Sequence, residues 1–303
     1  MTGTAAASAM GPASAPPNPA LVKIRDVIYQ VAGIFHPDNK HRLLEERCSK
    51  RMQVLGVASL RDYYDCLTVK ATRQAELTAL LNEITSGETC FFRNLPQLDA
   101  IRNVVLPKIT AARAKSSPRH LRIWSAGCST GEEPYTLSMT LLEEQKRHLK
   151  DWTFEILATD LNERSLAHAQ LGHYGTYSTR NVPEPFKQKY FLARDRELHV
   201  TAEVKANVNF QQVNLSDSTR MAFMKNVDIT LCCNVLIYFD SVSKRRVIGH
   251  FYSNLLPHGY LFLGHAESLY GVSEDFRLVH LPGCTAYLKS AEKTVAPEKA
   301  RPQ

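Results

Sequence analysis

The sequence predicts an α/β protein in which a small helical domain precedes a doubly wound sheet with helices on its faces. Between residues 21 and 114, apolar side chains recur at helical spacing, as in the LxxLLxxI run at 77–84. From residue 121 onward, short apolar strands alternate with amphipathic helices, which is typical of a parallel sheet. The polar stretch at 115–120 separates these two patterns, and we expect it to be a domain linker.

The elements of the second domain follow in a regular order. Apolar runs predict strands at 121–127, 154–160, 208–215, 228–239 and 259–265. Amphipathic segments between them predict helices at about 133–145, 163–170 and 242–256. Two closing runs, at 276–280 and 286–289, predict an antiparallel hairpin. This domain is therefore expected to span 121–290.

Both ends of the chain are poor in residues that a core could bury. Residues 1–20 are mostly Ala, Pro, Ser and Gly, and residues 291–303 are polar and contain proline. We expect both segments to be disordered tails.

The composition is that of a globular protein of 303 residues, 44% hydrophobic and 22% charged. The sequence has no run of about 18 apolar residues that could cross a membrane. The first 22 residues carry neither Lys nor Arg, so they do not resemble a signal peptide. We therefore expect a cytoplasmic protein without membrane insertion. The seven cysteines form no CxxC pairs, which predicts reduced thiols and no structural metal site.

Most of the net charge of +7 lies in the first third of the chain. Residues 21–120 hold 16 Lys and Arg against 10 Asp and Glu. A basic face of this kind can bind nucleic acid, an anionic membrane surface or an acidic protein. Acidic residues interleave with the basic ones, which argues against a disordered nucleic-acid arm. A solvated helical face explains the charge about as well as a docking surface does.

A Gly-rich segment, SAGCSTGEEP at 125–134, follows the first predicted strand and opens a helix. Small residues such as Gly127 let the backbone approach a ligand at the carboxyl end of a strand, where open α/β sheets bind ligands. The segment has neither GxGxxG nor GK[ST], so it does not indicate a diphosphate site. Glu132 and Glu133 could simply complement the helix dipole, an interpretation that we favour more for Glu133 than for Glu132.

Asp160 ends the second predicted strand, where such folds bind the two hydroxyls of a ribose. It could instead cap the next helix, but Asn162 is better placed for that. A cofactor that has a ribose and no diphosphate fits both segments, and S-adenosylmethionine is the leading candidate.

Six motifs, in this order, resemble those of the CheR-type chemoreceptor glutamate methyltransferases. They are ITSGETCFFR (84–93), IWSAGCSTGEEPY (123–135), LATDLN (157–162), VNL (213–215), CNVLIYFD (233–240) and GYLFLGHAES (259–268). The resemblance implies an all-helical amino-terminal domain, a methyltransferase domain with a mixed doubly wound sheet, and a small antiparallel β-subdomain inserted at about 174–210. It also implies S-adenosylmethionine as cofactor and S-adenosylhomocysteine as product.

The resemblance assigns roles to residues at the matching motif positions. It implies that Thr89 and Arg93 close over the cofactor, with Arg93 near its methionyl carboxylate and also part of the catalytic site. Glu132 would meet the methionyl end and Asp160 the ribose, while Tyr238 would orient the reactive methyl group and the incoming carboxylate. The remaining positions implied to lie beside the cofactor are Gly87, Gly127, Asn214, Leu215, Cys233 and Asn234.

This reaction needs alignment more than acid–base catalysis. A glutamate carboxyl, with a reference pKa of about 4.3, is already ionised at neutral pH, and a sulfonium is already an electrophile. The enzyme must align the reacting atoms and exclude water. This agrees with the absence of a Ser, Cys and His arrangement resembling a catalytic triad.

Three positions depart from the family motifs. Gly87 stands where many relatives have Asn, Cys233 where they usually have Arg, and Ala266 where they have Ser. The first two changes could each remove a hydrogen bond, worth roughly 0.5 to 3 kcal/mol if buried. They leave open an alternative function, a catalytically weak or inactive cofactor-binding signalling module. A third hypothesis, a nucleic-acid methyltransferase, is suggested by the basic pI; the absence of an NPP[YFW] motif and the modest charge excess argue against it.

The expected partner is the cytoplasmic helical domain of chemoreceptors. Some relatives grip a pentapeptide tether at the receptor's carboxyl end with a Gly-rich loop of the β-subdomain. The corresponding run here, at 191–210, is short and contains no glycine. We therefore expect a monomer that reaches the receptor without a tether, through its basic helical domain.

Overall fold

The computed structural model describes residues 18–85, 87–115 and 117–290. The predicted tail at 291–303 and most of the one at 1–20 lie outside the described residues. Within the latter, Asn18 caps a helix that begins at Pro19, so the amino-terminal prediction is too long. No helix in the described ranges is long and apolar enough to cross a membrane.

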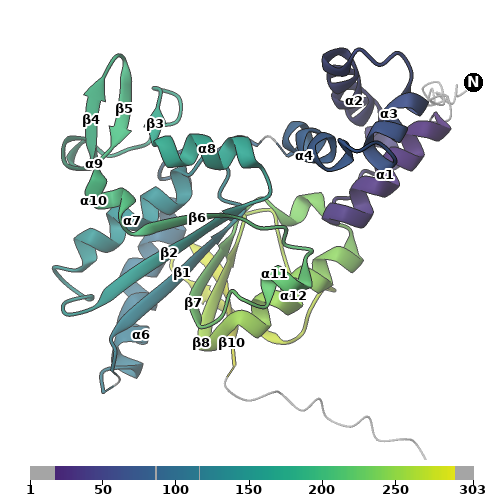
Figure 1. Ribbon diagram of the computed structural model, residues 1–303. Helices are drawn as coiled ribbons and strands as arrows, with labels where there is room; N and C mark the ends of the chain where they lie inside the picture. Colours follow the sequence, from purple (N-terminus) through teal and green to yellow (C-terminus); the bar gives the residue numbers. More distant parts are fainter. Residues whose placement is uncertain (1–17, 86, 116, 291–303) are drawn as a thin grey trace, which may run out of the picture.

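The first domain is a cluster of helices at the upper right of Figure 1. Its helices have a core of their own, formed by residues such as Ile24, Leu44 and Leu80. A short 3-10 turn at Asp38–Lys40 precedes the second helix. The helices are α1 (Pro19–Ala32), α2 (His41–Leu55), α3 (Leu60–Thr68) and α4 (Arg73–Ile84).

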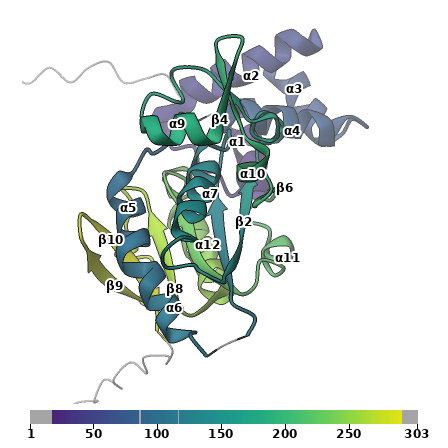
Figure 2. The ribbon, with the colours of Figure 1, turned by 90° about the vertical axis from the view of Figure 1, so that its left-hand side faces the viewer.

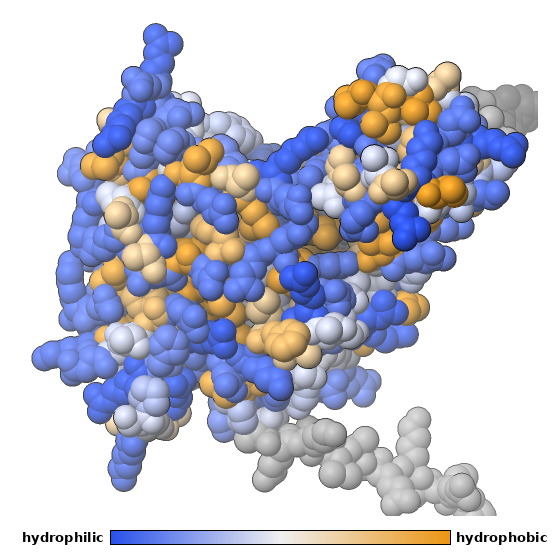
Figure 3. Space-filling model, in the orientation of Figure 1, coloured by the Kyte–Doolittle hydropathy of each residue, from blue (hydrophilic) through white to orange (hydrophobic). Residues whose placement is uncertain are grey.

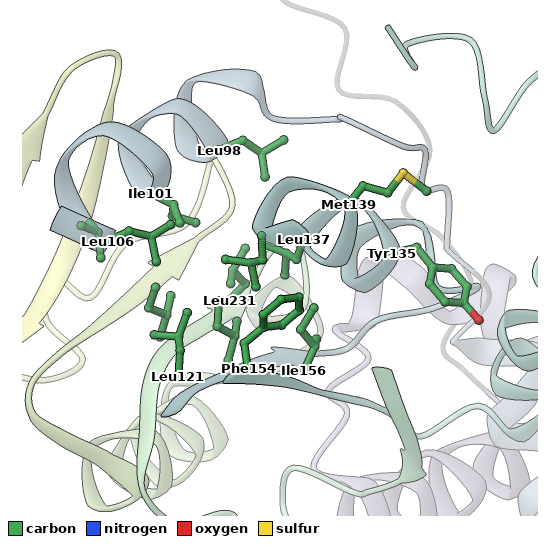
Figure 4. Packing of buried hydrophobic residues seen from close by; sticks show 14 of the residues in the cluster. Leu98, Ile101, Leu106, Leu121, Tyr135, Leu137, Met139, Phe154, Ile156 and Leu231 are labelled. Carbon is green, nitrogen blue, oxygen red and sulfur yellow. The ribbon is translucent and has the colours of Figure 1, made fainter. Parts of the chain in front are cut away.

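The next helices do not belong to this cluster, which corrects the expected domain boundary at 114. Helix α5 (Leu95–Ala100) continues through a π-helical turn (Ile101–Val105) into α6 (Leu106–Ala112). Leu98, Ile101 and Leu106 pack with sheet residues such as Leu121, as Figure 4 shows. Helical periodicity reveals a buried face but not what that face packs against, so the sequence assigned these helices to the wrong domain.

The second domain is built on a seven-stranded mixed sheet, with strand order β6-β2-β1-β7-β8-β10-β9. The first five strands in this order are parallel, and β10 runs antiparallel to both β8 and β9. The strands are β1 (His120–Ala126), β2 (Thr153–Asp160), β6 (Val208–Gln212), β7 (Val227–Cys232), β8 (Leu255–Leu263), β9 (Phe276–Leu281) and β10 (Cys284–Lys289).

Helices cover both faces of this sheet (Figures 1 and 2). Alternation along β1 shows the two layers, because Leu121 and Ile123 pack toward α5, α6 and α7, whereas Trp124 and Ala126 pack toward α12. The helices of this domain not yet bounded are α7 (Glu132–Glu144), α8 (Glu163–Leu171), α11 (Ser218–Met221) and α12 (Ser241–Asn254).

A small three-stranded antiparallel sheet lies between α8 and β6 in the chain. It contains β3 (His173–Tyr174), β4 (Phe191–Arg194) and β5 (Glu197–Val200), with helices α9 (Glu184–Tyr190) and α10 (Ala202–Lys205). We refer to this part as the β-subdomain. Residues 208–210, expected within it, instead belong to β6, as the apolar pattern alone predicted.

Candidate active site

A cavity of about 740 Å³ lies at the carboxyl ends of the parallel strands, against the helical domain. Above this edge of the sheet, the surface is hollowed between the helical domain and the β-subdomain (Figure 3). The structure brings to this cavity every site residue predicted from the sequence except Glu132. The predicted residues that line it are Gly87, Thr89, Arg93, Gly127, Asp160, Asn214, Leu215, Cys233, Asn234 and Tyr238.

The floor of the cavity is the loop that follows β1. Gly127 has a φ of +82°, and a Cβ atom there would lie 2.3 Å from Cγ2 of Val235. Its backbone N–H donates to the carbonyl of Thr159 at 2.7 Å, which ties the end of β1 to the end of β2. Glycine is therefore required for both the backbone conformation and the close approach.

The two carboxylates at the start of α7 point in different directions. The sequence analysis placed Glu132 beside the cofactor, but the structure places Glu133 in the cavity instead. Glu132 is buried away from the cavity, where its Oε2 accepts a hydrogen bond from Thr130 Oγ1 at 2.7 Å. Glu133 lines the cavity and accepts a hydrogen bond from Ser125 Oγ at 2.6 Å. Burial raises the pKa of Glu133, against the lowering effect of the Ser125 hydrogen bond. Neighbouring residues of a helix point in different directions, so only one can face the ligand.

Asp160 is fixed at the end of β2 by backbone hydrogen bonds. Its Oδ2 accepts from the N–H of Ser129 at 2.7 Å, and its Oδ1 accepts from the N–H of Asn162 at 2.8 Å. Burial raises its pKa, opposed by these backbone donors. The Asn162 side chain accepts from Ser165 N and caps α8, as predicted. Asp160 is therefore a rigid acceptor facing the cavity.

Glu267, a residue whose role sequence reasoning missed, holds the loops after β7 and β8 together. Its Oε2 accepts hydrogen bonds from Asn234 N at 2.8 Å and Gly264 N at 2.7 Å, and its Oε1 accepts one from Ile237 N at 3.3 Å. Asn234 has a φ of +62°, an uncommon conformation for a residue with a side chain. The available signal was an acid shortly after a strand's carboxyl end, within the GHAES motif.

Tyr238 is half-buried at the end of a 3-10 turn, Leu236–Tyr238, where an extended β7 was expected. Burial raises the pKa of its phenol, and the nearby Asp160 charge adds to this effect. The hydroxyl therefore stays protonated at neutral pH and can donate a hydrogen bond. The position of a Cβ atom at Gly87 would be 3.9 Å from this hydroxyl, so the glycine leaves room beside it.

Arg93 and Cys233 complete the methionyl side of the predicted site. Arg93 is exposed and donates to the carbonyl of Glu88 at 2.9 Å, and its charge lowers the pKa values of Glu133 and Tyr238. Burial raises the pKa of Cys233 far above its usual range, so this thiol is neutral and is not a nucleophile.

The helical domain contacts the same strand ends that carry the cavity residues. The amide of Asn214 donates to the carbonyl of Val31 at 2.6 Å, and the N–H of Phe35 donates to the carbonyl of Tyr238 at 2.8 Å. The side-chain amide of Asn162 donates to the carbonyl of Asn82 at 2.9 Å. Asn214 therefore uses its amide to hold α1, in addition to lining the cavity.

Comparison with known proteins agrees with this division of the chain. Residues 19–85 match the all-alpha domain of CheR methyltransferases, and residues 87–284 match their SAM-binding domain. The chain belongs to the CheR methyltransferase family. Its fold is accordingly that of S-adenosylmethionine-dependent methyltransferases, with the all-alpha CheR domain in front.

Several curated CheR-type proteins are similar over most of their length. A chemotaxis protein methyltransferase 2 of Vibrio cholerae is 35% identical, with 88% of this chain and 91% of that protein covered. A chemotaxis protein methyltransferase of Borreliella burgdorferi is 34% identical, with coverage of 83% and 88%. A chemotaxis protein methyltransferase 1 of Pseudomonas aeruginosa is 32% identical, with coverage of 84% and 92%.

The cavity of this CheR protein fits the cofactor of the family. The half-buried carboxylates of Glu133 and Asp160 face it, and S-adenosylmethionine offers an ammonium group and ribose hydroxyls as donors to such acceptors. The Gly127 position, which a side chain would fill, allows the ligand to approach the backbone.

We expect Glu267→Gln to weaken binding of S-adenosylmethionine by about tenfold or more, because an amide cannot accept all three backbone hydrogen bonds. Calorimetric titration measures this affinity, and circular dichroism verifies folding. The control is Glu274→Gln, an exposed acid in the same loop region. Unchanged affinity in a folded Glu267→Gln variant would show that the three hydrogen bonds accepted by Glu267 do not shape the cofactor site.

Proposed function

We propose that this CheR-family protein transfers a methyl group from S-adenosylmethionine to glutamate side chains of bacterial chemoreceptors. The products are glutamate methyl esters and S-adenosylhomocysteine, and the pathway is chemotaxis or a related chemosensory response. The supporting observation is that Glu133, Asp160, Arg93 and Tyr238 line one cavity in a chain with both CheR domains.

The residues of the cavity divide into binding and orienting groups. In this proposal, Asp160 accepts hydrogen bonds from the ribose, Glu133 receives the methionyl ammonium, and Arg93 pairs with the methionyl carboxylate. When bound, S-adenosylmethionine supplies an electrophilic methyl group on a positively charged sulfur.

The substrate carboxylate needs no base, because it is ionised at neutral pH. The phenol of Tyr238, kept protonated by its raised pKa, is placed to donate a hydrogen bond that orients this carboxylate. The helical domain lines one side of the cavity, and its contact with the bound reactants would limit access of water and so strengthen the electrostatic interactions inside. Positioning by these groups is what the chain contributes to the rate.

We expect Tyr238→Phe to lower the rate of methyl transfer roughly a hundredfold, with little change in cofactor affinity, because the hydroxyl acts on the reacting groups. Asp160→Asn should instead weaken cofactor binding. Transfer of labelled methyl groups to a cytoplasmic chemoreceptor fragment measures the rate, and release of methanol by alkali identifies esters. Tyr252→Phe on α12 is the control.

Two outcomes of this experiment would contradict the proposal. Alkali-stable label would exclude glutamate esters as the product. Cofactor binding by the wild-type protein without any transfer to receptor fragments would favour the inactive signalling module.

We also expect cofactor affinity to increase with pH through the raised pKa of Glu133. Below this pKa the free carboxyl carries a proton, which the binding of an ammonium group must displace. The affinity should therefore change by at most about tenfold per pH unit and level off above the pKa. Calorimetry from mildly acidic to mildly alkaline pH tests this.

The neighbouring carboxyl provides a matched control for this pH dependence. Glu133→Gln should bind weakly with a flatter pH profile, whereas Glu132→Gln, which changes a carboxyl outside the cavity, should keep the wild-type profile. A steep profile retained in Glu133→Gln would assign the proton to another group.

The proposed partner is the cytoplasmic helical domain of the receptor, recognised in the cytoplasm by a monomer without a carboxyl-terminal tether. Only Asp195 and Arg196 lie between β4 and β5, both with positive φ, so this hairpin has a tight turn and no long loop. The helical domain, next to the cavity, would then make the main receptor contact. Its residues 19–85 hold 10 Lys and Arg against 8 Asp and Glu, so most of the basic excess counted over 21–120 lies in residues 86–120, outside this domain.

We expect equal methylation rates for receptor fragments with and without their carboxyl-terminal pentapeptide. A pull-down with the immobilised pentapeptide should retain no protein. Strong retention, together with slower methylation of the shortened fragment, would show that the tether is used.

A further inference from the structure

Three side chains able to bind a metal ion meet in the β-subdomain, outside the cavity. His173 lies on β3, and Glu197 and His199 lie on β5. Each offers one ligand atom, and these three atoms all lie within 4.8 Å of one another. The two histidines are far apart in the sequence, so no short sequence motif indicates this set of possible ligands.

The pairing of the strands brings these side chains together. His173 and His199 are directly opposite in the antiparallel register of β3 and β5, and Glu197 lies two residues before His199 on the same face. The two imidazole rings stack with their centroids 3.7 Å apart and their planes 9° apart. Nε2 of His199 is 3.9 Å from Oε2 of Glu197. The backbone of the small sheet therefore fixes the three donors as neighbours.

We propose that His173, Glu197 and His199 form a binding site for a borderline divalent cation, with Zn²⁺ as the best match. Two imidazoles and one carboxylate are the donor set that Zn²⁺, Ni²⁺ and Cu²⁺ select, whereas Mg²⁺ and Ca²⁺ prefer sites made of oxygen. For both imidazoles to ligate one ion, the rings would have to rotate out of this stack about their side-chain torsions.

The surroundings of the site agree with a partly open cation position. Glu197 is exposed and both histidines are half-buried, so a bound ion would remain accessible to solvent. Lys205 brings a positive charge nearby, but its Nζ is hydrogen-bonded to the carbonyl of Leu171 at 2.6 Å. The carboxylate of Glu197 offsets this charge.

The site is linked to the Gly-rich loop at 125–134 through the residue next to His173. Tyr174 follows His173, and its hydroxyl donates to the carbonyl of Thr130 at 2.6 Å. A metal bound between β3 and β5 would therefore stabilise β3, the strand whose Tyr174 holds the Gly-rich loop. The proposal does not depend on the methyl-transfer reaction.

The test is calorimetric titration of the full-length, tag-free protein with ZnCl₂. We expect a saturable site in the wild-type protein and its loss in His199→Ala and in His173→Ala. ZnCl₂ should raise the melting temperature of the wild-type protein only, and MgCl₂ should not, because a ligand that binds the folded state stabilises it. The matched control is His280→Ala, an exposed histidine on an antiparallel strand, which should keep the site.

Two results would overturn the proposal. One is an unchanged zinc isotherm in folded His199→Ala. The other is a cobalt-loaded protein whose absorption spectrum shows thiolate ligation, because the proposed ligands are nitrogen and oxygen atoms.

Discussion

The parallel pairing of β1 with β2 on one side and β7 on the other is the constraint on which the site depends. Parallel strands end at the same edge of a sheet, so residues far apart in the chain come together there. This pairing brings Gly127, Asp160 and Asn234, which lie at or just after the ends of β1, β2 and β7, to the same edge of the sheet. Their loops are also joined directly, by the hydrogen bonds of Thr159 and Glu267. The cavity is therefore a property of the sheet and not of any single motif.

The helical domain is held by hydrogen bonds to the same strand ends. Its position is therefore coupled to the positions of the loops that line the cavity. Asn162 follows Asp160 and holds α4, Asn214 holds α1, and the carbonyl of Tyr238 pairs with Phe35. A displacement of the helical domain would therefore move the loops that carry the binding residues. In the proposed reaction, this one set of contacts would serve both water exclusion and alignment.

The strand ends could be predicted from the sequence because each carries a polar residue after an apolar run, as Asp160 does. The direction in which the first side chains of α7 point could not be predicted, since nothing in the EEP sequence tells which of Glu132 and Glu133 faces a ligand. The boundary at 114 was wrong for a related reason, as amphipathic α5 has the same pattern whether it packs on helices or on a sheet. The site of His173 and His199 depends on strand register, which a single sequence does not encode locally.

Cys233, at the position where the sequence analysis expects arginine from the family motif, would have two opposing effects in the proposed complex. A neutral thiol makes weaker hydrogen bonds than a guanidinium, which lowers affinity. However, a guanidinium beside Glu133 would compensate the charge of that carboxylate, whereas in the described part of the chain the exposed Arg93 is the cation that lowers the otherwise raised pKa of Glu133. In the proposed complex, the ammonium group of the cofactor would then supply part of the charge that compensates the ionised Glu133. We therefore expect the substitution to leave part of the charge compensation of Glu133 to the ligand, which would add to the pH dependence of cofactor binding.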